Sequence, residues 1–143
     1  MSEDSNLPSD AQRRSDVRVR ARLPVELSPE VVPLPRFREA KDEVAAIESE
    51  TVTISGGGFA FLHDHAVPVG TSFNVRLRLP GLPDPLTMRA KVVRCNVVEE
   101  SRDSPVFELG LTYTRIAEAA RAHIVSYVFR LQRATIASKS DNI

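Results

Sequence analysis

The segment from Phe73 to Leu79 constrains the fold most strongly, because apolar and polar residues alternate along it without a break. Such a period of two is typical of a strand with one face buried and one face in solvent. The turn Pro80–Pro83 follows, and a second β-type run covers residues 87–98. Two such runs joined by a proline- and glycine-containing turn predict a β-hairpin.

Short β-type runs separated by turn residues lie on both sides of this hairpin. After Thr114 apolar residues recur every three or four positions, which predicts an amphipathic helix at 117–133. Several short strands favour a closed barrel, because closure hides their edges. We therefore predict an all-β fold, a small six-stranded antiparallel β-barrel with a C-terminal α-helix, with a first strand from residue 17 to about 24–27 and further strands at 43–54, 59–62, 73–79, 87–98 and 107–113.

The length of 143 residues, with 42% hydrophobic content, fits one domain with one core. Residues 1–12 are polar and predict a disordered lead-in, whereas residues 134–143 predict a flexible tail. The folded domain is expected at 13–133. Within it, the segment 28–42 contains three prolines and predicts a long loop.

The charges balance at 19 basic and 19 acidic residues, so no overall field attracts the chain to nucleic acid or anionic lipid. The arginines between Arg13 and Arg22 could form a strand that binds single-stranded nucleic acid, but no aromatic residues are interleaved with them. No secretory signal or membrane-spanning run is visible, and Cys95 is the only cysteine. We expect a cytoplasmic protein with no nucleic-acid partner and no membrane insertion.

The residue types that carry chemistry do not form a recognisable catalytic set. His63 and His65 flank Asp64, a spacing that could hold a metal ion, but the sequence offers no further ligand and a surface turn is the simpler interpretation. His123 lies in the predicted helix without a partner for a triad. The glycines at 56–58 lack the lysine of a phosphate-binding loop. We predict no catalytic residues, no metal and no cofactor.

Two short motifs carry the most specific signal. QRRSDVR places Arg14 and Arg18 four residues apart before the first predicted strand, and TISGGG ends the second, at 53–58. This pattern resembles the PilZ domain family, in which RxxxR and [D/N]xSxxG motifs together bind cyclic di-GMP. The resemblance extends from Ala11 to Arg133 and includes the strand around Gly110. It implies a bacterial signalling protein with ligand-binding residues Arg13, Arg14, Arg18, Thr53, Ser55, Gly57, Gly58 and Gly110.

The chemistry of these residues suits the ligand that the resemblance implies. Arginine forks bind phosphate or the O6 and N7 edge of guanine, and glycines let a base approach the backbone. Ser55 adds a hydroxyl and a neighbouring amide. Arg13 adds a third guanidinium group. In the family, an arginine at this position often accompanies the binding of two stacked ligand molecules.

Thr53 departs from the family pattern, which has Asp or Asn at this position. Loss of a charge-assisted hydrogen bond costs roughly 1.5 to 3 kcal/mol, or about 10- to 150-fold in affinity. Two readings follow. The chain is either a cyclic di-GMP receptor that regulates a partner protein in motility, pili or surface polysaccharide, or a PilZ-like adaptor that binds the nucleotide weakly or not at all. The helix at 117–133 is a candidate surface for a homodimer.

Overall fold

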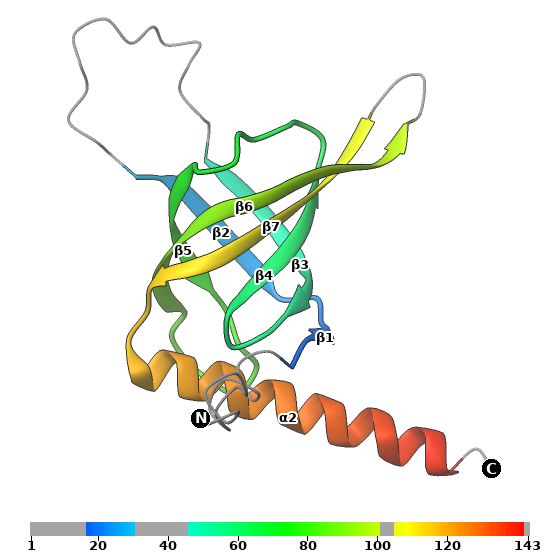
Figure 1. Ribbon diagram of the computed structural model, residues 1–143. Coiled ribbons are helices and arrows are strands. Elements are labelled where there is room, and N and C mark those ends of the chain that lie inside the picture. The colour runs from blue at the N-terminus through cyan, green and yellow to red at the C-terminus, as the bar shows by residue number, and fades with distance from the viewer. Residues whose placement is uncertain (1–16, 31–45, 101–104, 142–143) are drawn as a thin grey trace, which may run out of the picture.

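The computed structural model describes residues 17–30, 46–100 and 105–141, which form seven strands and one long helix (Figure 1). All strand pairs are antiparallel. The elements are β1 (Val19–Arg20), β2 (Pro24–Pro29), β3 (Ile47–Ile54), β4 (Gly58–His63), β5 (Ser72–Leu77), β6 (Leu86–Glu100), β7 (Pro105–Arg115) and α2 (Glu118–Asp141).

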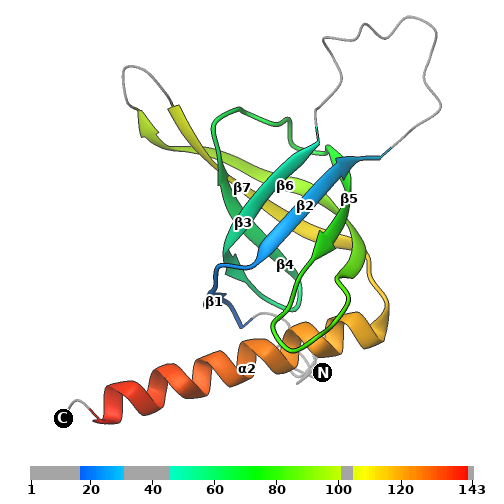
Figure 2. The ribbon, with the colours of Figure 1, turned by 180° about the vertical axis from the view of Figure 1, so that it is seen from behind.

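Six of the strands close into a barrel in the order β3-β2-β5-β6-β7-β4, because β3 also pairs with β4. Figure 2 shows the side of this barrel on which β2 and β3 lie next to each other. The short strand β1 adds to β3 outside the closed ring. The predicted fold class, a six-stranded antiparallel barrel with a C-terminal helix, is confirmed.

The first predicted strand, from residue 17 to about 24–27, is two strands in the structure, the short β1 and the main strand β2, which begins at Pro24 and ends at Pro29. β1 and β2 pair with successive parts of β3, and the register shifts by one residue between them, since Val19 faces Ile54 but Val25 faces Ser49. Arg22 is the extra residue of this bulge. The alternation of buried and exposed side chains continues through it, which explains why the sequence pattern shows one strand.

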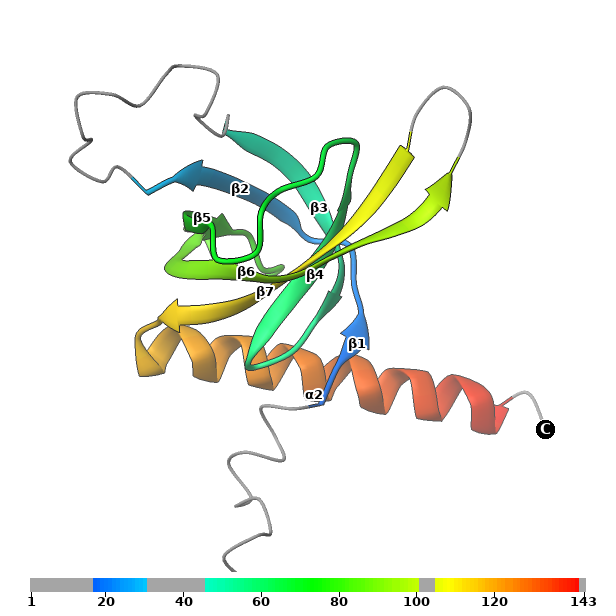
Figure 3. The same cartoon turned by 45° about the horizontal axis from the view of Figure 1, so that its top comes forward.

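The barrel core consists of the inward-facing residues of every strand, among which Phe59, Phe61 and Phe73 are fully buried. Cys95 is partly buried and packs at the edge of this core. Helix α2 lies across one end of the barrel and contacts β1 (Figure 3). Ile124 and Val128 of the helix are fully buried and belong to the same core.

Several element ends differ from the sequence prediction. The helix was expected at 117–133 but continues to Asp141, into the predicted tail, and projects beyond the barrel (Figures 1 and 3). β2 continues through Pro29 because it pairs with β5, so the predicted loop at 28–42 starts too early. Residues 31–45 and the predicted lead-in at 1–12 lie outside the described residues. Within the described residues, no helix combines the length and apolar character needed to cross a bilayer.

Candidate functional site

The turn between β3 and β4 is built around the hydroxyl of Ser55. Its oxygen accepts hydrogen bonds from the amides of Gly57 (3.1 Å) and Gly58 (3.2 Å), and it donates to the Gly58 carbonyl at 3.3 Å. The Ser55 amide donates to the same carbonyl at 2.9 Å. Ser55 is only 4% exposed, so its side chain shapes the turn rather than facing solvent.

Three hydrogen bonds connect strand β7 to this turn. The carbonyl of Gly57 accepts from the Tyr113 amide and the Thr112 hydroxyl, both at 3.1 Å. The Tyr113 hydroxyl donates to the Ser55 carbonyl at 3.3 Å. Burial raises the pKa of Tyr113 far above its usual range, so this donor keeps its proton at all physiological pH values. The turn is therefore a fixed part of the barrel.

Gly58 is required by packing. A Cβ atom at this position would lie 2.0 Å from the backbone carbonyl oxygen of Leu111, a distance that no relaxed side chain can adopt. The final glycine of the TISGGG motif is therefore explained by the close approach of β4 to β7, before any ligand is considered.

The register of β1 brings one predicted arginine next to this turn. Val19 faces Ile54, so Arg18, the preceding residue, falls opposite Ser55 if the antiparallel register continues. Arg18 is exposed. Two segments more than thirty residues apart in the sequence, the second arginine of RxxxR and the TISGGG turn, are thus brought together. Arg13 and Arg14, also predicted site residues, lie outside the described residues.

A row of directly opposed residues crosses the outer face of the barrel beside the turn. Arg20 of β1 faces Thr53, and Thr53 faces Ala60 of β4. Ala60 faces Gly110 of β7, which in turn faces Arg94 of β6. Since neighbouring strands lie about 4.8 Å apart, Thr53 and Arg94 are separated by about 14 Å along this face. The row is a floor of small residues with an arginine at each end, and Ala60 (1% exposed) and Gly110 in its middle are buried in the structure.

Arg94 lies directly over Gly110. A Cβ atom on Gly110 would be 2.9 Å from Nη2 of Arg94, so the glycine makes room for the guanidinium. Nη2 also donates to Oε1 of Glu108 at 3.2 Å, an ion pair in which both side chains remain about one-third exposed. The group that comes closest to the backbone at Gly110 is therefore the Arg94 side chain.

Two buried polar atoms of the described residues have no hydrogen-bond partner, and both belong to this row. They are Oγ1 of Thr53 and Nε of Arg94. A buried polar atom without a partner costs free energy, and its presence in a folded protein calls for a reason such as a ligand. In a second row of opposed residues beside the first, Gly58 faces Thr112 and Thr112 faces Lys91. Lys91 adds a further positive charge on the β6 side.

The arrangement suits a flat anionic ligand with hydrogen-bonding edges. The floor is made of glycine, alanine and threonine, which allow close approach, and basic residues of β1 and β6 stand on either side. Among the described residues, neither Arg18 nor Arg20 forms an ion pair. Beside the row lies an open hollow lined by Arg22, Ser49, Glu50, Thr51, Val52 and Leu62.

Sequence reasoning missed Arg94. Strict alternation along β6, which places Met88, Ala90 and Val92 in the core, would also turn Arg94 inward. A bulge between Val92 and Arg94 reverses the alternation and places the arginine outside. The only signal in the sequence was the arginine itself. Strict alternation would bury it, and a buried unpaired arginine is rare.

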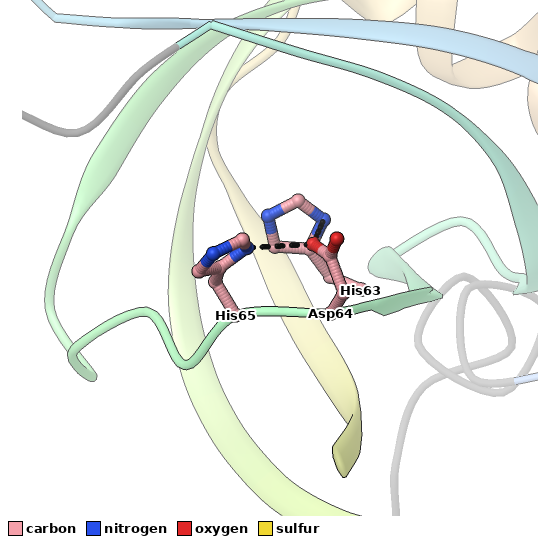
Figure 4. Close-up of polar contacts among 3 residues, drawn as sticks. All are labelled: His63, Asp64 and His65. Carbon is pink, nitrogen blue, oxygen red and sulfur yellow. Dashed lines mark hydrogen bonds and ion pairs between the residues drawn. The ribbon is translucent and has the colours of Figure 1, made fainter. Parts of the chain in front are cut away.

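The histidines lie away from this row. His63 ends β4 at the end remote from the Ser55 turn, His65 follows it in the next loop, and His123 is exposed on α2. His63 and His65 both approach the carboxylate of Asp64 (Figure 4). Burial, more than the charges around it, lowers the pKa of His63.

Comparison with known proteins identifies the fold. The family model described as PilZ domain matches residues 12–130. Among solved structures, the Bacillus subtilis Inhibitor of motility (MotI/DgrA) shares 24% identity with a TM-score of 0.62, over 82% of this chain and 50% of that chain. The present chain therefore spans half the length of that protein.

Two further structures cover nearly the whole of both chains. The PilZ domain of YcgR from Escherichia coli with c-di-GMP shares 14% identity with a TM-score of 0.57, over 88% of this chain and 95% of that chain. A tetrameric PilZ domain from Xanthomonas campestris, self-assembled through a helical bundle, shares 17% identity with a TM-score of 0.56, over 94% and 95% of the two chains. A comparison with curated proteins finds no significant match.

Proposed function

Because the chain belongs to the PilZ domain family, we propose that it is a non-enzymatic receptor for cyclic di-GMP. The observation that supports the proposal is the pairing of Val19 with Ile54, because its continuation by one residue would bring Arg18 opposite the Ser55–Gly58 turn. The bound ligand in the YcgR structure belongs to a domain with the same fold, and this likeness supports the choice of ligand.

The ligand would lie on the floor of small residues. Arg18, together with Arg13 and Arg14, would bind the phosphates or a guanine edge through guanidinium forks. Gly57 would let a base approach the backbone, whereas the space next to Gly58 and Gly110 is occupied by the Leu111 carbonyl and the Arg94 guanidinium.

Arg94 would contact the far side of the ligand. Its ion pair with Glu108 is about one-third exposed at both side chains, and such pairs are typically worth less than about 1 kcal/mol. The guanidinium can therefore exchange Glu108 for a phosphate or for the O6 and N7 atoms of a guanine at little cost. This assignment adds Arg94 to the site residues predicted from the sequence.

Thr53 sets the expected strength of binding. Its hydroxyl has no partner within the described residues, so it is free to form one neutral hydrogen bond with a guanine. The family's Asp or Asn would offer more acceptors. We expect an affinity about 10- to 150-fold weaker than that of a variant with the motif residue restored.

Ligand binding would change the N-terminal surface. The arginines that would grip the ligand lie on the segment before β1, so occupancy would draw this segment against the barrel beside α2 and β1. The altered surface would regulate a partner protein of motility, pili or surface polysaccharide systems. The Bacillus subtilis protein with this fold is an inhibitor of motility, which supports the first of these.

An adaptor that does not depend on the nucleotide is the alternative function. One observation favours it: the Ser55 hydroxyl makes its hydrogen bonds within the turn, and Thr53 replaces the Asp or Asn of the motif, so the turn keeps its shape without a ligand. In that case the same barrel surface would contact the partner protein directly.

Isothermal titration of the purified protein with cyclic di-GMP tests the proposal. Saturable heat that is lost in an Arg14→Ala, Arg18→Ala double variant would support a receptor, and the stoichiometry would show whether one or two ligands bind. Arg76→Ala is the matched control, because Arg76 is an exposed arginine of β5, which is not a strand of the proposed site. Absence of heat in the wild type, with binding restored by Thr53→Asp, would favour the adaptor.

A further inference from the structure

Three side chains with metal-binding atoms converge where β4 leaves the barrel. His63 is the last residue of β4, and Asp64 and His65 begin the loop that follows (Figure 4). Each offers one ligand atom, an imidazole nitrogen or a carboxylate oxygen, and these atoms all lie within 4.8 Å of one another. The cluster is at the opposite end of β4 from the Ser55 turn, so it is separate from the proposed nucleotide site.

The distances are close to those that a bound ion would impose. Oδ1 of Asp64 lies 2.7 Å from Nδ1 of His65 and 3.6 Å from Nδ1 of His63. Two ligand atoms of a tetrahedral ion, with bonds of about 2.0 to 2.1 Å, lie about 3.4 Å apart. Side-chain rotations alone can bring the three atoms to this separation, since His65 and Asp64 are 80% and 70% exposed.

The barrel fixes one of the three ligands in place. His63 still pairs with Phe107 in the sheet, and its ring packs near that of Phe61 with centroids 6.0 Å apart. Only 23% of its side chain is exposed. The two mobile ligands can therefore close on an ion against a positioned imidazole, while solvent has free access from the other side.

We propose that His63, Asp64 and His65 form a binding site for a divalent transition-metal ion. Two imidazoles and one carboxylate suit Zn²⁺, Ni²⁺ or Cu²⁺, whereas Mg²⁺ and Ca²⁺ prefer oxygen ligands alone. Three protein ligands leave at least one coordination position for water or for a side chain of another protein. The spacing of the two histidines in the sequence could hold a metal ion, but a surface turn was the simpler interpretation, because the sequence could not show that Asp64 turns toward both histidines.

The test is isothermal titration of the untagged, metal-free protein with NiCl₂ and with ZnCl₂. We expect saturable binding of one ion per chain, and no heat of binding with MgCl₂ at the same concentrations. His65→Ala should weaken binding at least tenfold, and the His63→Ala, His65→Ala double variant should abolish it. His123→Ala is the matched control, because it removes the third histidine of the chain from an exposed position on α2 and should leave the titration unchanged.

A second measurement guards against loss of folding in the variants. His65 is highly exposed, so His65→Ala and Asp64→Asn should keep the circular dichroism spectrum of the wild type while binding the metal at least tenfold more weakly. The visible absorption spectrum of the Co²⁺-loaded protein should likewise disappear in His65→Ala. Saturation with Mg²⁺ as strong as with Ni²⁺, unchanged Ni²⁺ binding in the folded double variant, or no saturable binding by the wild type would each overturn the proposal.

Discussion

The hydroxyl oxygen of Thr51 lies 3.0 Å from the amide nitrogen of Leu23 and accepts its hydrogen bond. The same hydroxyl donates to the carbonyl of Ala21 at 2.6 Å. Thr51 is fully buried, and its side chain thus spans the bulge at Arg22 that separates β1 from β2. One threonine supplies the two hydrogen bonds that the interrupted ladder cannot make, and so holds the segment that presents Arg18.

Substitution of Thr51 should expose this role. Thr51→Val keeps the shape of the side chain but leaves the Leu23 amide buried without an acceptor, which costs about 1 to 3 kcal/mol of unfolding free energy. Urea denaturation monitored by circular dichroism measures the loss. Thr51→Ser, which keeps the hydroxyl, should retain most of the stability, and an equal loss in both variants would contradict the assigned role.

Gly58→Ala should strongly destabilise the barrel. The new methyl group would lie 2.0 Å from the Leu111 carbonyl oxygen, and overpacking against rigid backbone costs about 3 kcal/mol or more. Gly110→Ala is the informative comparison, because its methyl group would meet the flexible guanidinium of Arg94 instead. We expect thermal denaturation to show a much smaller decrease for Gly110→Ala, and similar decreases would argue against this explanation.

Arg94→Ala should weaken binding of cyclic di-GMP about tenfold or more if the guanidinium contacts the ligand, since hydrogen bonds to charged groups contribute roughly 1.5 to 3 kcal/mol. Titration calorimetry of the variant measures the change in affinity. Arg89→Ala is a closely matched control: Arg89 is also an outward arginine of β6 in an ion pair, with Glu30 at 3.3 Å, but it lies outside the row.

A variant of Glu108 should change the affinity for cyclic di-GMP in the opposite direction from Arg94→Ala. Glu108→Gln removes the carboxylate that competes with an anionic ligand for Arg94, so the affinity should rise. If the Arg89 variant lost as much affinity as the Arg94 variant, general electrostatic attraction would be the better explanation.

Thr53→Asp should raise the affinity for cyclic di-GMP by about 10- to 150-fold, because a carboxylate restores the charge-assisted hydrogen bonds of the family motif. The Thr53 hydroxyl lacks a partner within the described residues, so Thr53→Val should leave the unfolding free energy unchanged or raise it. Calorimetry and urea denaturation of the two variants separate the ligand effect from the structural one. Unchanged affinity in Thr53→Asp would show that position 53 does not contact the ligand.

The alternating strands, the turn residues and the terminal helix were predictable from the sequence, because burial of one face imposes a period of two on a strand and of 3.6 on a helix. The family motifs at Arg18 and at 53–58 were also visible as local patterns. Bulges were not predictable, since an extra residue leaves the burial pattern intact, as at Arg22, or reverses it where two apolar residues are adjacent, as at Val92 and Val93.

The sequence by itself therefore determined the class of fold and the motif that marks the site, since both depend on local spacing. Only the tertiary structure decided which residues meet. Strand register aligns Arg94 with Gly110 and Thr53 and pairs Val19, next to Arg18, with Ile54, next to Ser55, and the loop conformation turns Asp64 toward both histidines. These residues are brought together by hydrogen bonding between neighbouring strands. The pairing of the strands is set by closure of the whole barrel, so it cannot be read from the spacing of residues along one segment.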